Sequence, residues 1–313
     1  MTFTERVKEE ILIKKLTEPC CKVSALSAFV RGAGTLLVSK SFVGFEISTE
    51  NKKACDYFSS VLTSIYGVEL KREEKVDKFN GKLKYKISLL SEKSTRILTE
   101  LGIITESAEG LQVNLSVDKY LVENECCKRA YIIGAFQGSG SVTVPSEGHK
   151  SSTSYHLEFV FSKYQTASCV AELLSEVGFM PKLTERKESF IVYFKNGDEI
   201  SELLYFMGAK KCGFELQEII VKKVMNNDTN RKRNCDMGNI SKQIEASIKQ
   251  VSEITLIDQT IGLDGLPKTI KDTCLLRLEN KDATLEEMAQ IAGVSKSCLN
   301  HRLRKISEIA KNL

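Results

Sequence analysis

The pattern of apolar and polar positions indicates a chain that is folded almost throughout, in alternating helices and strands. Residues 1–16 place charged and apolar residues at helical spacing, without the apolar run of a signal peptide. Farther along, short runs typical of strands separate longer runs with helical periodicity, and none approaches the length of a membrane span. We therefore expect a cytoplasmic protein without a membrane partner.

Two segments of the chain match each other in pattern without a gap. They are residues 20–34 and residues 126–140, at a constant offset of 106 residues. Each segment begins with two cysteines and a lysine, continues with helix-forming apolar residues and ends in Gly-x-Gly. The first two thirds of the chain therefore contain an internal repeat.

The elements predicted after each segment are also parallel. In the first copy these are a strand at 42–47, a helix at 51–66, strands at 68–73 and 83–89 around a polar turn with Asn80-Gly81, and a helix at 92–101. In the second copy they are a strand at 155–161, a helix at 164–177, strands at 182–185 and 189–194, and a helix at 199–207. Each unit thus reads helix, strand, helix, two strands, helix.

The Gly-x-Gly sequences do not fit a phosphate-binding loop. A dinucleotide-binding fingerprint requires a strand before the glycines, whereas helix-like residues precede both of these and a strand-like segment follows. Small residues at these positions instead let two helices touch backbone to backbone along a pseudo-twofold axis. We assign this packing role to Ser27, Ala28, Gly32 and Gly34, and to Gly134, Ala135, Gly138 and Gly140.

The paired segments resemble the LAGLIDADG homing endonucleases. Leu26 to Gly34 read LSAFVRGAG and Ile132 to Gly140 read IIGAFQGSG, in place of the nine-residue motif. The resemblance implies paired helices at the core of a saddle-shaped pair of sheets that straddles DNA. The eighth residue of the motif is the family's metal-binding acid. In this sequence that position holds Ala33 in the first copy and Ser139 in the second. Because two-metal cleavage needs carboxylates, we expect no catalytic residues and no enzyme activity.

Basic residues on or near the candidate strands leave a second question open. They either contact DNA through the sheets or keep the strand edges soluble. These residues are Lys71, Arg72, Lys75, Lys182, Arg186 and Lys187.

A polar, basic stretch at 230–236 precedes a helix-like run from Ile240 to Ile254. We interpret this region as a connector. Its cations Arg231, Lys232 and Arg233 form either a solvated linker or an arm that contacts DNA phosphates.

Three helices are predicted near the C-terminus, at 267–278, 285–292 and 296–309. Thr284 with Glu287 forms a capping box, and Ser295 can cap the last helix. Gly293 stands where a helix-turn-helix needs a positive φ. On the last helix, the positions that face away from the predicted core offer hydrogen-bond donors to phosphates and base edges. The predicted DNA-binding residues are Lys296, Ser297, Asn300, His301, Arg302, Arg304 and Lys305.

A degenerate LAGLIDADG repeat joined to a C-terminal helix-turn-helix resembles the WhiA family of bacterial regulators over the whole chain. The matching residues include Asn230, Arg231 and Asn234, Cys235, Asn239, and the runs Ser295 to Ser297 and Asn300 to Leu303. The resemblance implies a sequence-specific transcription regulator tied to sporulation, cell division and chromosome segregation. A nucleoid or division protein that binds DNA nonspecifically is the alternative, and an active endonuclease is a third reading.

The expected fold class is therefore α+β, with two pseudo-symmetric LAGLIDADG-like repeats and saddle-shaped antiparallel sheets, followed by an all-α helix-turn-helix domain. The expected boundaries are 1–112 and 113–224 for the repeats, 225–255 for the basic connector and helix, and 256–313 for the helix-turn-helix domain.

Composition narrows the chemistry. The net charge of +4 is too small to identify a nucleic-acid binder by itself. Ten cysteines include the pairs Cys20-Cys21 and Cys126-Cys127 but no Cys-x-x-Cys, so we expect no zinc site and no cofactor. Double-stranded DNA is the expected partner, and we therefore expect the protein to be associated with the nucleoid. Whether it also binds RNA polymerase or a sigma factor is left open by the sequence. The pseudo-symmetry makes dimerisation unnecessary, and we expect a monomer.

Overall fold

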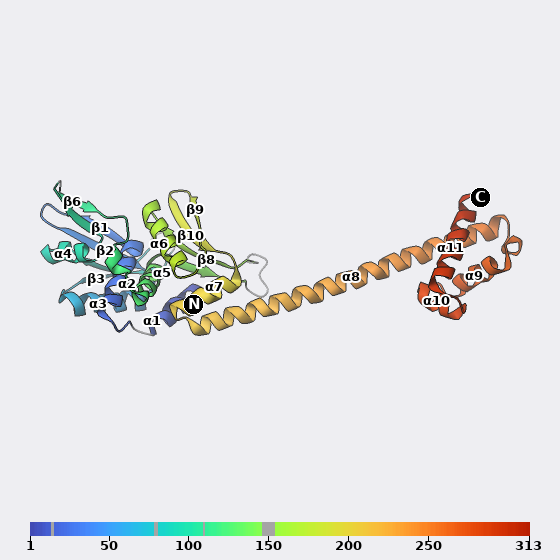
Figure 1. Ribbon diagram of the computed structural model, residues 1–313, viewed down its shortest axis with the longest axis horizontal. Coiled ribbons are helices and arrows are strands. Elements are labelled where there is room, and N and C mark those ends of the chain that lie inside the picture. The colour runs from blue at the N-terminus through green and yellow to red at the C-terminus, as the bar shows by residue number, and fades with distance from the viewer. Residues whose placement is uncertain (14–15, 78–80, 109, 146–153) are drawn as a thin grey trace. The chain divides into compact units, whose positions relative to one another are not determined.

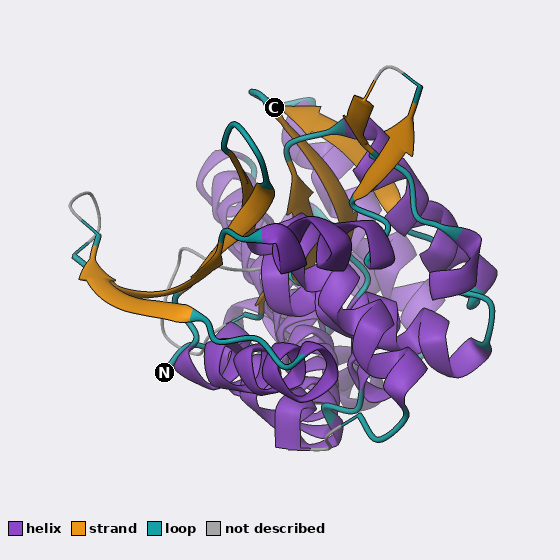
Figure 2. Cartoon of the chain, turned by 90° about the vertical axis from the view of Figure 1, so that its left-hand side faces the viewer, coloured by secondary structure: helices purple, strands orange, loops and turns teal. Residues whose placement is uncertain are grey.

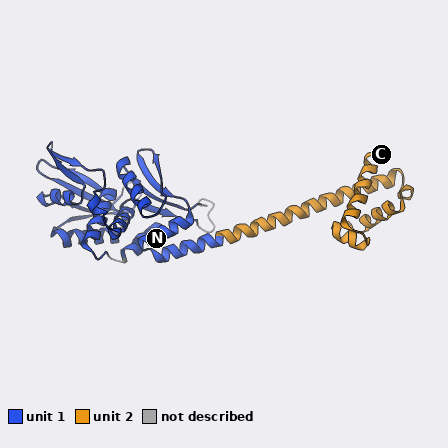
Figure 3. Ribbon diagram, viewed as in Figure 1, with its two compact units in different colours: residues 1–222 blue, residues 223–313 orange. Residues whose placement is uncertain are grey.

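The computed structural model describes residues 1–13, 16–77, 81–108, 110–145 and 154–313. The chain divides into two compact units (Figure 3), residues 1–222, here called the LAGLIDADG-like unit, and residues 223–313, here called the C-terminal unit. Among the described helices, none combines the length and the apolar character that crossing a membrane requires.

The first repeat has a four-stranded antiparallel sheet with three helices packed against it. The sheet has the order β1-β2-β4-β3, and the helices are α2, α3 and α4. Its elements are α2 (Pro19–Ala33), β1 (Gly34–Val38), β2 (Val43–Thr49), α3 (Lys52–Tyr66), β3 (Lys71–Val76), β4 (Leu83–Leu89) and α4 (Glu92–Glu100). The core of this repeat contains Phe29, Phe45 and Phe58, all fully buried.

The second repeat reproduces this topology, with a sheet of order β7-β8-β10-β9. Its elements are α5 (Glu125–Ser139), β7 (Gly140–Thr143), β8 (His156–Phe161), α6 (Tyr164–Glu176), β9 (Lys182–Arg186), β10 (Ser189–Phe194) and α7 (Gly197–Met207). Figure 1 labels both repeats, and Figure 2, with strands in orange, shows how strongly the strands twist. The predicted fold class, two repeats with antiparallel sheets followed by helices, is confirmed.

Three local features go beyond the predicted unit. The segment after each motif helix joins the sheet as an edge strand, so each sheet has four strands rather than three. A hairpin of β5 (Ile104–Ser107) and β6 (Gly110–Val113) and a short helix, η1 (Lys119–Leu121), connect the repeats. In the predicted turn before β4, Asn80 lies outside the described residues, and Gly81 has a φ of +68°.

The two motif helices α2 and α5 pack side by side with their backbones in contact. A Cβ atom at Gly134 would lie 2.0 Å from the carbonyl oxygen of Ala25, and one at Gly138 would lie 2.9 Å from that of Phe29. A Cβ at Gly32 would lie 3.2 Å from backbone atoms of Gly138 and Ser139. The packing interpretation of these glycines is therefore confirmed.

Three residues assigned to that contact have other roles. Gly34 and Gly140 end their helices in extended conformation, where a Cβ would collide with Val30 or Phe136 of the same helix. Ser27 is buried and donates a hydrogen bond to the carbonyl of Leu101, 2.7 Å away, so it anchors the end of α4. Gly34 and Gly140 are therefore needed for the change of chain direction at the helix ends, and Ser27 for its hydrogen bond, rather than for contact between the two helices.

Helix α1 (Phe3–Ile13) contacts both repeats: it packs beside α3 of the first and joins the core of the second. Its Val7 and Ile11 belong to the same buried cluster as Phe136. The carboxylate of Glu10 accepts hydrogen bonds from the backbone nitrogens of Lys211 and Cys212, at 2.7 and 2.9 Å. It thereby caps the free N–H groups at the start of α8 (Lys210–Thr260).

The C-terminal unit has a core of its own. It comprises the end of α8, η2 (Leu263–Gly265), α9 (Lys268–Glu279), α10 (Leu285–Ile291) and α11 (Lys296–Lys311). Ile254 and Ile257 of α8 join the buried side chains of the three short helices. The three predicted helices are present within two residues of their expected bounds, and Pro267 precedes α9 as its N-cap instead of opening it.

Candidate nucleic-acid interface

Helices α10 and α11 are joined by a tight turn that matches a helix-turn-helix. Thr284 and Glu287 cap the start of α10 reciprocally: the Glu287 carboxylate accepts from the Thr284 nitrogen at 2.7 Å, and the Thr284 hydroxyl accepts from the Glu287 nitrogen at 3.1 Å. The Thr284 bonds lower the pKa of Glu287. At the other end, Gly293 adopts a φ of +65°, and Val294 donates back to the Ala289 carbonyl. This closure fixes the direction in which α11 departs.

The side chains of α11 divide into a buried and an exposed face. Leu299, Leu303 and Ile306 are at most 3% exposed and pack in the core of the unit. Ser295 caps the helix by accepting a hydrogen bond from the nitrogen of Cys298, at 3.2 Å. The predicted DNA-binding residues lie on the opposite side: Lys296, Ser297, Asn300, His301, Arg304 and Lys305 are exposed, and Arg302 is half-buried.

The exposed face of α11 carries cations with few acidic neighbours. Lys296 pairs with Glu286 of α10 at 3.4 Å, between two exposed side chains. Within the described parts of the chain, no ion pair is found for Arg302, Arg304 or Lys305. Sequence reasoning expected a face without acids and missed Glu286, because this acid comes from the neighbouring helix. The remaining cations stay available to an anionic partner.

A buried arginine holds the loop that precedes α10. Arg277, only 3% exposed, donates from Nη1 to the carbonyls of Ala283 at 2.9 Å and Asn280 at 3.3 Å. Burial lowers the pKa of its guanidinium. Ser247 of α8 donates to the carbonyl of Lys281 in the same loop. Arg277 and Ser247 thus fix the loop that leads into α10. No signal in the sequence indicates this role, because a basic residue on a helix is usually exposed.

The basic stretch at 231–233 lies inside α8, and its side chains are exposed. Arg233 donates to the side-chain oxygen of Asn230 at 3.0 Å. Successive helical residues point about 100° apart, so the three cations do not share one face. The region predicted as a connector is therefore helical, and contact of its cations with DNA phosphates stays a prediction.

The LAGLIDADG-like unit has a cleft where the motif helices end. It has a volume of about 1020 Å³ and is lined by Ala33, by Glu5 and by Glu50, among others. Glu50 forms an ion pair with Lys82 at 2.7 Å, and Glu5 accepts a hydrogen bond from the backbone nitrogen of Thr2. The hydroxyl of Ser139, at the end of α5, donates to its own helix. The two motif positions thus supply no carboxylate for a metal ion.

Basic residues of the first sheet are paired with acids. Lys71 and Lys75 contact Glu73 at 2.7 and 2.6 Å, and Arg72 contacts Asp56 at 3.5 Å. Hydrogen bonds from the two lysines lower the pKa of Glu73 to about 2. In the second sheet, Arg186 and Lys187 lie at the β9–β10 turn, and Lys182 lies at the other end of β9. All three are exposed, and none has an ion pair among the described residues.

Comparison with known proteins assigns each part of this geometry to one family. The model of the WhiA N-terminal LAGLIDADG-like domain matches residues 19–104, that of the WhiA LAGLIDADG-like domain matches 128–226, and that of the WhiA C-terminal HTH domain matches 229–310. A protein of Alkaliphilus oremlandii named "Probable cell division protein WhiA" is 34% identical over 321 residues, covering 100% of this chain and 98% of that protein. The chain belongs to the WhiA family.

Two further comparisons agree with this assignment. A Clostridium botulinum protein with the same name is also 34% identical, over 317 residues that cover 100% of this chain and 99% of that protein. The crystal structure of full-length WhiA from Thermatoga maritima has a TM-score of 0.59 and 22% identity, and it covers 100% of this chain and 99% of its own. The WhiA fold therefore extends over the whole chain, and its HTH domain includes α9, α10 and α11. The relatives are named for cell division and not for an enzyme activity.

Proposed function

We propose that this WhiA protein is a sequence-specific DNA-binding transcription regulator whose helix α11 contacts bases in the major groove. The unpaired cations on the exposed face of α11 are the observation that supports this proposal most directly. Arginine donates to guanine, asparagine pairs with adenine, and serine and lysine contact bases or phosphates. Arg304 and Asn300 are the proposed base-contacting pair, and Arg302 and Lys305 are proposed phosphate contacts.

The process served by this regulator is also part of the proposal. The curated relatives carry the name of a cell division protein, which supports a role in division. Links to sporulation and chromosome segregation rest on the family resemblance alone. The LAGLIDADG-like unit serves in this proposal as a scaffold without nuclease activity, because Ala33 and Ser139 replace the acids and the cations of the first sheet are paired.

Selection from pooled genomic DNA tests the proposal. The full chain and a truncation ending at Lys223 are incubated with genomic fragments at near-physiological salt, and the retained fragments are sequenced. We expect the full chain to enrich one motif and the truncation to lose this enrichment. If the truncation still enriches the motif, the LAGLIDADG-like unit and not α11 recognises the sequence. Flat enrichment would favour the alternative, a nucleoid or division protein that binds DNA through phosphates alone.

Point variants locate the contacts on α11. Arg304→Ala and Asn300→Ala should each weaken binding to the selected motif by about 1 to 3 kcal/mol, or roughly 5- to 150-fold. Lys311→Ala removes an exposed cation from the last turn of the same helix and is the matched control. Equal effects of Arg304→Ala and Lys311→Ala on matched and random DNA would contradict base recognition by α11.

A further inference from the structure

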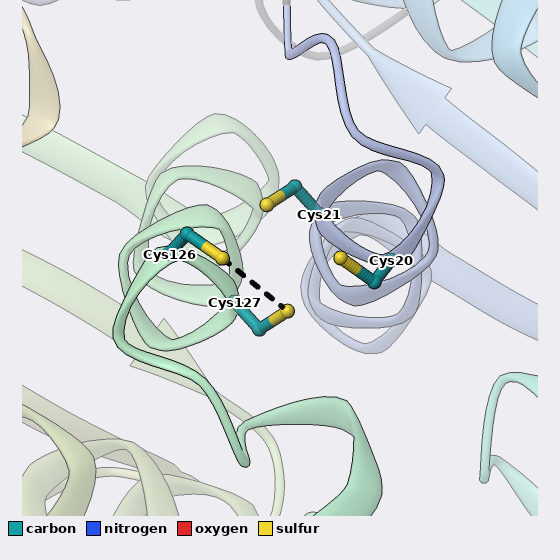
Figure 4. A group of neighbouring side chains, drawn as sticks. All are labelled: Cys20, Cys21, Cys126 and Cys127. Carbon is teal, nitrogen blue, oxygen red and sulfur yellow. Dashed lines mark hydrogen bonds between the residues drawn. The ribbon is translucent and has the colours of Figure 1, made fainter.

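Four cysteine side chains meet between the two motif helices. Cys20 and Cys21 lie in the first turn of α2, and Cys126 and Cys127 lie in the first turn of α5. The four sulfur atoms all lie within 4.8 Å of one another, and the Sγ atoms of Cys126 and Cys127 are 4.0 Å apart. Figure 4 shows the sulfurs pointing into the space between the helices.

The repeat explains why these residues meet. Each pair occupies the same position in its copy, at the offset of 106 residues, and α2 and α5 pack side by side along their length. First-turn side chains of two helices that start at the same level must converge beside the pseudo-twofold axis. The absence of Cys-x-x-Cys predicted no zinc site, but that reasoning considered only ligands close in sequence. Here each half contributes two ligands.

The donor set matches the requirements of a zinc ion. Structural zinc sites commonly use four thiolates in a tetrahedron at about 2.3 Å from the metal, which places the sulfurs roughly 3.8 Å apart. The observed group, with separations of up to 4.8 Å, needs a contraction of about 1 Å, within reach of cysteine side-chain rotation. All four thiols are free, so no disulfide competes for them in this structure.

The helix ends and the access from solvent suit a metal ion, whereas burial raises the pKa of the Cys21 and Cys127 thiols. The bound cation itself must therefore keep these two sulfurs deprotonated. Both helices begin at or just before the cysteines, so their positive N-terminal ends face the sulfurs. Cys21 and Cys127 are buried, whereas Cys20 and Cys126 are exposed and leave a path from solvent. Among the described residues, this group is the one place where three or more potential metal ligands converge so closely.

We propose that Cys20, Cys21, Cys126 and Cys127 bind one Zn²⁺ ion that clamps α2 to α5. All four positions are filled by protein ligands, so the ion is structural and offers no open site for catalysis. Ala33 lies 13 residues after Cys20, or about 20 Å along the helix, so the clamp is at the end of the helix pair away from the former catalytic positions. Binding releases the thiol protons and joins the two repeats.

Metal analysis of the full chain, purified with reductant and without a polyhistidine tag, tests the proposal first. We expect one zinc per chain by elemental mass spectrometry. The double variant Cys20→Ser with Cys126→Ser should lose the metal, because it removes one exposed ligand from each helix and leaves the core intact. Cys235→Ser with Cys298→Ser is the matched control, since both cysteines are exposed and lie outside the group; it should keep the metal.

Cobalt binding gives a test that does not depend on the variants. Titration of the reduced, metal-free full chain with Co²⁺ should produce the visible and near-ultraviolet absorption of a tetrahedral thiolate complex, saturating at one ion per chain. Added Zn²⁺ should abolish this absorption and raise the melting temperature. Failure of the reduced protein to bind either ion would overturn the proposal, as would zinc retained by the Cys20→Ser, Cys126→Ser variant. The proposal would also be overturned if the purified protein contained iron and sulfide, or if these cysteines formed disulfides in the presence of reductant.

Discussion

The helix α11 and the first sheet of the LAGLIDADG-like unit both carry clustered basic residues, yet their electrostatics differ. In the sheet, Lys71, Arg72 and Lys75 each contact a carboxylate within 3.5 Å. On α11, Arg304 and Lys305 have no such contact among the described residues. Exposed ion pairs contribute little to stability, but they neutralise the charge that a phosphate backbone would need.

This difference teaches that basic residues identify a DNA-binding surface only together with their partners. The sequence predicts a DNA contact for Lys305 and leaves one open for Lys71. In the structure, the period-two geometry of β3 puts Glu73 on the same face as Lys71 and Lys75. On α11, Glu308 follows Arg304 by four residues and Lys305 by three, which would allow an ion pair, but none joins them among the described residues. The contrast therefore calls for tests on both units.

The largest expected effect is a loss of stability in the LAGLIDADG-like unit that leaves the C-terminal unit unchanged. Gly134→Ala places a Cβ atom 2.0 Å from the carbonyl oxygen of Ala25, so α2 and α5 must move apart. We expect the LAGLIDADG-like unit to lose about 3 kcal/mol of unfolding free energy or to misfold. The C-terminal unit, with its own buried cluster, should keep its transition in differential scanning calorimetry.

Gly238→Ala is the control for that variant. Gly238 lies within α8, and a Cβ there meets no atom within 4 Å. Alanine should stabilise the helix by about 0.5 to 1 kcal/mol. If Gly134→Ala lowers both transitions equally, the two units unfold together and the comparison between them loses its basis.

A pH-dependent effect on the LAGLIDADG-like unit is expected from Lys8. Burial lowers the pKa of Lys8 from 10.5 to about 8, with its ammonium 3.1 Å from the carbonyl of Gln137. Between these pH values the unfolded chain binds more protons than the folded chain, so this residue makes the free energy of unfolding rise with pH. Relative to Lys8→Met, the wild type should gain about 2 kcal/mol between pH 7 and pH 9.5.

Urea unfolding at the two pH values measures this effect. Comparison with the variant cancels the titration of cysteines and other groups that both proteins share. A difference between wild type and Lys8→Met that does not change with pH would show that Lys8 keeps an ordinary pKa in the folded protein.

A smaller effect is expected at the start of α10. Thr284→Ala removes the hydroxyl of the capping box and should destabilise the C-terminal unit by about 1 kcal/mol. Thr255→Ala removes a hydroxyl that bonds only to the Val251 carbonyl of the same helix, and it should change stability by less than about 0.5 kcal/mol. Equal shifts of the melting temperature would show that the cap adds nothing to this unit.

The smallest effect compares the two basic surfaces directly. Lys305→Ala should reduce the slope of log affinity against log salt by about one, as for the loss of one phosphate contact. Lys71→Ala should leave the slope unchanged, since Lys71 is 2.7 Å from Glu73. DNA binding over a series of salt concentrations gives both slopes. A reduced slope for Lys71→Ala would show that DNA also contacts the first sheet.

Much of the secondary structure could be predicted because local signals mark it. Strand β10 and strand β4 have the expected bounds, and Asn51 caps α3 by accepting from the nitrogen of Ala54. The predicted unit does not include the strands β1 and β7, because short strands that follow a helix directly have little periodicity of their own. The sequence does not predict the helix at 230–236, because polar residues without an apolar stripe give no helical signal.

The sequence by itself determined the repeat, the glycines that let two helices touch, the missing acids at positions 33 and 139, and the buried and exposed faces of α11. The faces of α11 depend on neighbours one or two helical turns apart, and the other features appear when the two copies are aligned with each other. Only the tertiary structure decided which cations have acidic partners, that α1 contacts both repeats, and that four thiols meet beside the pseudo-twofold axis. Those contacts join segments far apart in the chain, and their distances follow from packing and not from spacing.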